Sequence, residues 1–260
     1  MADACDAIGN TGHMICVMND VAEHARLAEM ARAHLDCSSK SFMGTVASLD
    51  AAADVIAMVR SATRRSVAGT AECCLLHLIN STPPLTFNAN PLKCLRTVAE
   101  AGEGCIVTSY MMLGATGPVT LAEALAQGYA ECLAGLALTQ LWRPGTPVIM
   151  GLFATQFSMR TMQPWFGVPL SQTVQLYCAA LARHLGVPVR GDGGITSAFI
   201  DDSSAGYEGG RATTTALLAG CDFILHAVGW LESGRCVSLA KFDREAAAHS
   251  ARRATAHRFW

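Results

Sequence analysis

The segment PVRGDGG, residues 188–194, places one carboxylate, Asp192, among three glycines directly after a short apolar run. Glycine permits backbone conformations and close approaches that a β-carbon prevents, so such a turn suits a floor from which Asp192 projects. A carboxylate in that position provides the counter-charge for a bound cation. The same pattern fits a solvated turn between a strand and a helix, and the segment alone leaves both interpretations open.

The elements that must position this segment are short apolar runs that alternate with longer helical patterns, as in repeated βα units. We expect strands at 14–18, 41–46, 73–79, 105–110, 147–153, 187–191 and 222–229. We expect helices at 21–34, 49–61, 91–101, 121–142, 171–185 and 205–219. The strand runs are mostly continuous, as is typical of parallel strands covered on both faces. The chain is therefore expected to form a single α/β domain over residues 1–260.

Two α/β folds share this spacing, the doubly wound sheet and the TIM (β/α)₈ barrel. A doubly wound nucleotide-binding protein carries a glycine-rich phosphate loop after an early strand, and this sequence has none. We predict a TIM-type barrel with seven visible βα units, because the tail after residue 245 offers no convincing eighth strand. An incomplete barrel exposes strand edges, so the chain is expected to need a partner or an oligomer, or to be truncated.

Two of the expected helices begin with residues that affect how a helix starts. Thr120 and Glu123 form a T-x-x-E capping box before the helix at 121–142. Gly206, Gly209 and Gly210 lie at the start of the helix at 205–219. Each costs about 1 kcal/mol relative to Ala in a helix interior, so the first turns of that helix are expected either to be irregular or to pass close to another backbone or a ligand.

The composition excludes several classes of partner. The chain is 51% hydrophobic and 15% charged, has a formal net charge of −2 and has no run of Lys or Arg, so no nucleic-acid partner is expected. No apolar run reaches the roughly 20 residues of a membrane span. The first residues lack a secretory signal pattern, so we expect a cytoplasmic protein whose 11 cysteines are reduced. With no Cys-x-x-Cys pair, no metal site is expected.

Ligands of a TIM barrel bind at the carboxyl ends of its strands, and this rule selects the candidate site residues. The catalytic candidates are Asp192, His226 and His77, and the substrate-binding candidates are Tyr110, Phe153, Gln156, Gly193, Gly194, Trp230 and Glu232. Aromatic faces attract a quaternary ammonium, so these residues suit a small organic cation. Aromatic and imidazole side chains near strand ends also occur simply as core residues, and both interpretations stay open. No Ser-His-Asp spacing or nucleophile elbow points to covalent hydrolysis.

Five segments, in order, resemble the trimethylamine methyltransferase superfamily. They are GATGPVTLAEAL (114–125), AECLAGLALTQLWRPGTPVIMG (130–151), HLGVPVRGDGG (184–194), DDSSAGYEGG (201–210) and LLAGCDFILHAVGWLESG (217–234). The resemblance implies a TIM barrel that moves a methyl group from a methylated amine to the cobalt of a separate corrinoid protein. Superfamily members with pyrrolysine act on trimethylamine. This sequence contains none, so the resemblance implies a quaternary amine such as glycine betaine.

Roles follow for the candidate residues under this reading. Asp192 is expected to hold the cation, the aromatic residues to wall it, and His77 and His226 to bind a substrate carboxylate or to face the corrinoid. The chain has no Asp-x-His-x-x-Gly cobalamin-ligand motif, so the corrinoid is expected on the partner. One alternative is a catalytically silent barrel that binds a methylated amine or a partner subunit. Another is an unrelated barrel enzyme such as an aldolase or isomerase, disfavoured because no Lys lies at a strand end.

Overall fold

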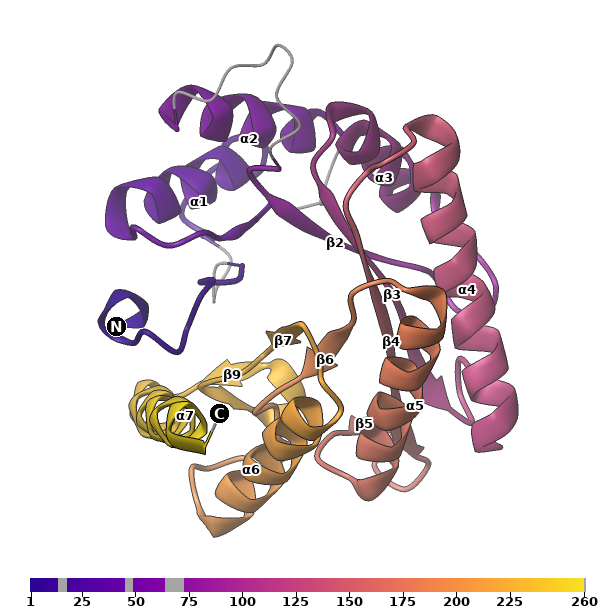
Figure 1. The fold of residues 1–260 in the computed structure, drawn as a ribbon, viewed down its shortest axis with the longest axis vertical. Coiled ribbons are helices and arrows are strands. Elements are labelled where there is room, and N and C mark those ends of the chain that lie inside the picture. The colour runs from indigo at the N-terminus through magenta and orange to yellow at the C-terminus, as the bar shows by residue number, and fades with distance from the viewer. Residues whose placement is uncertain (14–17, 45–48, 64–72, 260) are drawn as a thin grey trace.

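The computed structural model describes residues 1–13, 18–44, 49–63 and 73–259. Its strands are β1 (Met43–Gly44), β2 (Leu76–Asn80), β3 (Gly104–Leu113), β4 (Val148–Ser158), β5 (Gln163–Trp165), β6 (Arg190–Asp192), β7 (Phe223–Leu225), β8 (Trp230–Leu231) and β9 (Cys236–Val237). Its α-helices are α1 (Glu23–Cys37), α2 (Leu49–Ala62), α3 (Ala89–Ala101), α4 (Leu121–Trp142), α5 (Pro169–Leu185), α6 (Ser203–Leu218) and α7 (Leu239–Phe259). The helices lie around the outside of the strands (Figure 1).

The strands form a curled, mostly parallel sheet. β1, β2, β3 and β4 pair in that order and in parallel, and β5 returns antiparallel to β4 as a hairpin. An isolated parallel bridge between Met150 and Val189 links β4 to the segment that leads into β6, and β6 pairs in parallel with β7. The result is an α/β half-barrel whose concave side faces the centre of the ring in Figure 1.

Hydrophobic residues pack on both sides of this sheet. The larger core lies between the strands and the surrounding helices and includes Ile79, Val107 and Leu95. A smaller cluster, formed by Met43, Ile106 and Leu225 with their neighbours, lies on the other side. Burial on both faces accounts for the continuous apolar runs that mark the parallel strands in the sequence.

The βα alternation expected from the sequence is confirmed, with shifted boundaries. The helix at 121–142 is confirmed at both ends as α4, whereas the strand expected at 147–153 extends to Ser158 and that at 222–229 ends at Leu225. Of the first expected strand, residues 14–17 lie outside the described residues, as do residues 45–46 of the second.

One local expectation is wrong. Thr120 makes no bond to a backbone N–H; its hydroxyl instead donates to Glu123 Oε2 at 2.5 Å, so the capping box is not formed. The first turns of α6 are regular, and Asp202 Oδ1 caps the helix by accepting from the backbone N–H groups of Ser204 and Ala205. The close approach to another backbone is found at Gly209, where a β-carbon would lie 3.2 Å from the carbonyl oxygen of Gly194. The tail, for which no eighth strand was expected, forms most of α7.

The two ends of the described chain lie on the same side of the fold (Figure 1). The Cys5 Sγ lies 3.5 Å from the carbonyl oxygen of Ala246 and 3.3 Å from Ser250 Oγ. The Arg253 guanidinium also donates to the carbonyl oxygen of Asp6. These contacts hold the N-terminal segment against α7, so the first and last helical elements of the ring are joined through it.

Glu131 on α4 connects this helix to β3 and to the loop after β2. Its buried carboxylate accepts from the hydroxyls of Ser81 at 2.5 Å and Ser109 at 2.7 Å, and from the backbone N–H of Leu85 at 2.7 Å. Gln127 Nε2 donates to the same carboxylate at 3.0 Å. One side chain therefore satisfies donors from a strand, from a loop and from its own helix.

Replacing this carboxylate tests its structural role. We expect Glu131→Ala to lower the free energy of unfolding by about 3 kcal/mol, because two buried hydroxyls and the backbone N–H of Leu85 lose their acceptor. Chemical denaturation measures the change. Glu123→Ala on the exposed face of the same helix is the control and is expected to cost less than about 1 kcal/mol. Equal losses in the two variants would contradict the role assigned to Glu131.

The glycine segment after β6 packs directly against the end of β7. The backbone N–H groups of Gly193 and Gly194 donate to the carbonyl oxygens of Leu225 and His226, both at 2.8 Å. A β-carbon on Gly193 would lie 2.5 Å from the Cα of Ala227, closer than such atoms approach. The bare glycine edge is therefore covered by protein, and it does not form an open floor beneath a ligand.

A buried ion pair on α7 supports the same segment. Lys241 Nζ donates to the carbonyl oxygen of Gly194 at 2.9 Å and to Glu245 Oε1 at 2.6 Å, and the Lys241 side chain is fully buried. Glu245 Oε2 accepts from the backbone N–H of Gly229 at 2.8 Å. The pair thus links α7 to the loops that follow β6 and β7.

The close approach of these loops predicts the effect of adding one methyl group. We expect Gly193→Ala to destabilise the fold by about 2 kcal/mol, because overpacking forces the two backbones apart. Gly206→Ala is the matched control, since nothing lies within 4 Å of its β-carbon position in α6. That change is expected to be neutral or to stabilise by about 0.5 kcal/mol. A Gly193→Ala variant as stable as this control would show that the contact is unimportant.

Candidate substrate-binding site

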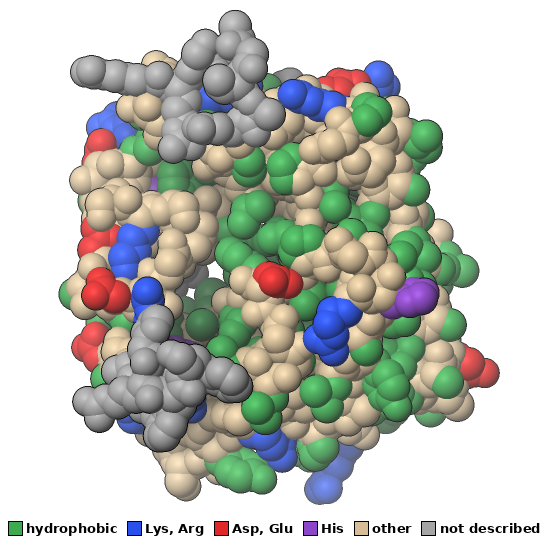
Figure 2. Space-filling model, viewed as in Figure 1, with side chains coloured by type: hydrophobic (Ala, Val, Ile, Leu, Met, Phe, Trp, Pro, Cys, Tyr) green, Lys and Arg blue, Asp and Glu red, His purple; other side chains and the backbone are tan. Residues whose placement is uncertain are grey.

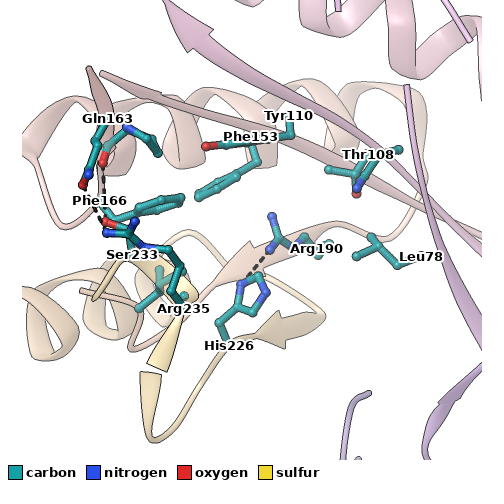
Figure 3. Close-up of a pocket in the computed structure, with 14 residues that line it drawn as sticks. Leu78, Thr108, Tyr110, Phe153, Gln163, Phe166, Arg190, His226, Ser233 and Arg235 are labelled. Carbon is teal, nitrogen blue, oxygen red and sulfur yellow. Dashed lines mark hydrogen bonds between the residues drawn. The ribbon is translucent and has the colours of Figure 1, made fainter. Parts of the chain in front are cut away.

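A cavity of about 400 Å³ lies inside the curl of the sheet, towards the carboxyl ends of its strands. Figure 3 shows its side chains converging from β2, β3, β4, β6 and the loops after β7 and β8. The lining residues are Leu78, Asn80, Thr108, Tyr110, Phe153, Gln163, Pro164, Phe166, Arg190, Ile195, His226, Ser233, Gly234 and Arg235. This is the end of the sheet at which the sequence places the candidate site.

Three aromatic rings form one wall of the cavity, which we call the aromatic wall. Tyr110, Phe153 and Phe166 are stacked, with centroid separations of 5.4, 5.7 and 6.3 Å and interplanar angles of 22° or less. Burial, helped by the Asp192 charge, raises the pKa of Tyr110 to about 12. Its hydroxyl therefore stays protonated at neutral pH, and the wall carries no charge of its own.

A charged cluster lies beside this wall. His226 Nδ1 is 3.0 Å from Asp192 Oδ1 and 3.2 Å from Arg190 Nη2, and Arg190 Nη2 is 3.6 Å from the same Asp192 oxygen. The guanidinium carbon of Arg190 lies 4.9 Å from the centroid of the Phe153 ring. Burial lowers the pKa of Arg190 and Asp192 opposes this, but an arginine remains protonated in proteins. Arg190, Asp192 and His226 form a charged cluster at the cavity.

The backbone at β6 and β7 brings these three side chains together. Arg190 and Asp192 are two residues apart on β6, so they lie on the same side of the strand. The backbone N–H of Asp192 donates to Gln175 Oε1 of α5 at 2.8 Å. His226 follows β7 with a φ of 54°, a left-handed conformation that few non-glycine residues adopt. A neutral imidazole in this position uses Nδ1 either to donate to Asp192 or to accept from Arg190.

Several residues selected from the sequence lie at this site. Tyr110, Phe153 and His226 line the cavity, and Asp192 lies behind it, in contact with His226. Trp230 makes an edge-on ring contact with His226, with centroids 5.8 Å apart. The strand-end rule therefore locates the site, although none of these contacts tests the catalytic or binding roles predicted for the residues.

Other selected residues do not line the cavity. His77 is next to Leu78 on β2, on the opposite face of the strand, where its buried ring fills the space beside Gly44. Gln156 is exposed near the end of β4, and Glu232 contacts Arg235 only through its carbonyl oxygen. Gly193 and Gly194 are covered by the segment around Ala227. The expectation that these residues surround one ligand is therefore not supported by their positions.

Several cavity residues were not selected from the sequence. Arg190 carries a usable signal, because it lies two residues before Asp192 and strand alternation places both on one face. Thr108 has the same relation to Tyr110 on β3. Gln163 and Arg235 come from short hairpins without a strand signal, and Arg235 Nη2 donates to Gln163 Oε1 at 3.2 Å. Ser233 lies in one of these hairpins as well.

The surface shows no feature of a nucleic-acid protein on the face in Figure 2. Among the described residues drawn there, Lys and Arg side chains lie singly or near Asp and Glu, without a continuous basic stripe. Within the described part of the chain, every helix is too short or too polar to traverse a lipid bilayer. The cavity inside the curl of the sheet is therefore the candidate binding site.

Known proteins resemble this chain over most of its length. Glycine betaine methyltransferase of Desulfitobacterium hafniense (strain Y51) is 33% identical over 242 residues, which are 93% of this chain and 50% of the relative. Proline betaine:corrinoid methyltransferase of Eubacterium limosum is 33% identical over 159 residues, 61% of this chain and 33% of the relative. Trimethylamine methyltransferase MttB of Methanosarcina thermophila is 33% identical over 162 residues, 62% of this chain and 33% of the relative.

The chain spans half or less of the length of each of these relatives. The model of the family described as trimethylamine methyltransferase (MTTB) matches residues 1–257. The chain therefore belongs to the trimethylamine methyltransferase family.

Proposed function

We propose that the chain is the methyltransferase domain of an enzyme that moves a methyl group from a quaternary amine, such as a betaine, to the cobalt of a separate corrinoid protein. The observation that carries the proposal is the aromatic wall of the cavity at the carboxyl ends of the strands. Stacked faces attract a quaternary ammonium through their negative quadrupoles. Similar proteins are named as betaine or trimethylamine methyltransferases, which supports this class of substrate.

The same reasoning extends to the fold. We propose that residues 1–260 are one domain and that the half-barrel belongs to a TIM (β/α)₈ barrel. The parallel order from β1 to β4, the link to β6 and β7, and the helices outside support this. Ligand binding at the carboxyl ends of barrel strands agrees with the position of the cavity.

The lining of the cavity agrees with a methyl acceptor that is carried by another protein. Among the described residues, the lining includes no Cys or Lys, and its nucleophilic imidazole, His226, is engaged by Asp192 and Arg190. A corrinoid on a partner protein would supply a reduced cobalt as nucleophile. The task left to this chain is to hold the substrate in line with that acceptor and to exclude water, which positioning alone can accomplish.

Removal of a methyl group from a quaternary amine needs no catalytic acid. When it loses a methyl group, the leaving group is already a neutral tertiary amine, so no proton has to be delivered. The aromatic wall fixes the methylated nitrogen, and the protonated Tyr110 hydroxyl adds a neutral polar group beside it. Orientation rather than proton transfer is thus the main contribution of these side chains.

The charged cluster suggests a revised role for Asp192. Its carboxylate is engaged by His226 at 3.0 Å and by Arg190 at 3.6 Å, so it is already compensated by protein groups. We propose that Asp192 orients Arg190 and His226 and does not hold the substrate cation itself. His77, on the outer face of β2, is given no role in the reaction.

A turnover assay tests the proposed function. The chain is incubated with reduced cobalamin and with glycine betaine, proline betaine, carnitine or trimethylamine, and methylcobalamin formation is followed by its absorbance. At least one quaternary amine is expected to donate its methyl group. Binding without turnover would favour the catalytically silent barrel, and neither binding nor turnover would overturn the proposal.

A variant of the aromatic wall tests the observation behind this proposal. We expect Phe166→Leu, which keeps most of the volume but removes the π-face, to weaken binding of the active quaternary amine about 3- to 30-fold. Phe87→Leu, which alters a ring packed in the core outside the cavity, is the control and is expected to leave the affinity unchanged. Calorimetric titration measures both. An unchanged affinity in the Phe166 variant would contradict a cation site at this wall.

A further inference from the structure

We propose that Arg190 and Thr108 form a subsite for a carboxylate carried by the substrate, so that the cavity selects zwitterionic quaternary amines over simple amine cations. The inference rests on the proposed function, because it assigns the second half of the same substrate. It names Arg190 and Thr108 as specificity-determining residues.

Arg190 has donors that the protein does not use. Among the described residues, its guanidinium makes one hydrogen bond, from Nη2 to His226 Nδ1, and the buried Nε has no partner. Its side chain is 3% exposed. A guanidinium has five N–H groups arranged to meet a carboxylate, and burying them unpaired is unfavourable. A bound carboxylate would satisfy the groups left over.

Thr108 presents a second unused polar atom at the same place. Its Oγ1 is buried and has no hydrogen-bond partner among the described residues. A β-carbon on Gly151 would lie 2.4 Å from Thr108 Oγ1 and 3.4 Å from Arg190 Cδ, so both side chains meet above this glycine. Figure 3 shows Thr108 and Arg190 together on one side of the cavity. A hydroxyl and a guanidinium this close suit one anionic group.

The charge of the cavity favours the same substrate. Among the described residues, its lining includes Arg190 and Arg235 but no Asp or Glu. A simple cation bound there would meet no free carboxylate, because Asp192 lies behind the lining and is already paired with Arg190 and His226. A zwitterion places its carboxylate at Arg190 and Thr108 and its methylated nitrogen against the aromatic wall.

Asp192 does not make the subsite redundant. Its Oδ1 lies 3.0 Å from His226 Nδ1 and 3.6 Å from Arg190 Nη2, so it pairs with one edge of the guanidinium. The Arg190 guanidinium also lies over the Phe153 ring. These two contacts hold the guanidinium beside the aromatic wall, which fixes the substrate's direction in the cavity.

Quaternary ammonium ligands with and without a carboxylate provide the first test. The wild-type chain is titrated calorimetrically with glycine betaine, choline and tetramethylammonium, which share a methylated quaternary nitrogen. We expect glycine betaine to bind more than about tenfold more tightly than the other two, because only it carries a carboxylate. Equal affinity for the three ligands would overturn the subsite and leave the proposed function standing. No binding of any ligand would overturn both.

Two variants assign the effect to residues. Arg190→Gln is expected to weaken glycine betaine about tenfold or more without weakening choline, and Thr108→Val to weaken glycine betaine about threefold or more. Arg96→Gln, on the exposed face of α3, is the charge-matched control and should change neither affinity. Thr108→Val removes an unpaired hydroxyl, so it is expected to fold even if the Arg190 variant does not. Full glycine betaine affinity in Thr108→Val, or in a folded Arg190→Gln, would overturn that residue's role.

Discussion

The interaction on which the site depends is the burial of the Arg190 charge beside Asp192 and His226. A guanidinium taken out of water requires compensation, and here the compensating groups come from the same strand and from the end of the next one. The short β6–β7 pair is therefore held by side-chain charges as well as by backbone hydrogen bonds. Because Arg190 also covers Phe153, the charged cluster and the aromatic wall are fixed relative to each other.

Buried carboxylates on helices extend this arrangement to the surrounding loops. Glu131 on α4 binds donors from β3 and from the loop after β2, and Glu245 on α7 joins Lys241 to the segment after β7. Only 15% of the residues are charged, yet several of them are buried and paired within the fold. These contacts tie α4 and α7 to the strands and loops beside them.

The sequence predicts the helices and strands of the fold better than it predicts the residues of the site. Continuous apolar runs locate β3 and β4, and the apolar pattern locates both ends of α4. The β5, β8 and β9 strands are two or three residues long and have no detectable periodicity. No helix is expected from the sequence after residue 219, whereas α7 runs from Leu239 to Phe259 and contacts the N-terminal segment.

The position of a strand's end is not enough to predict the site residues, because a side chain must also lie on the face of the sheet that lines the cavity. Tyr110 and Phe153 lie on the concave face and line the cavity, whereas His77 is one residue out of phase with Leu78 and lies on the other face. Arg190 follows from the same alternation once Asp192 is placed. The covering of Gly193 by Ala227 depends on two segments 34 residues apart, and no local pattern in the sequence shows it.

Membership of the trimethylamine methyltransferase family and the composition of the cavity point to one account, in which an aromatic wall holds a methylated nitrogen and Arg190 holds a carboxylate. The most direct measurement is a crystal structure of the chain with glycine betaine. The account predicts the carboxylate within hydrogen-bonding distance of Arg190 and Thr108, and the methylated nitrogen against Tyr110 and Phe166. A ligand bound in the opposite direction, with its nitrogen at Asp192 and its carboxylate away from Arg190, would contradict it.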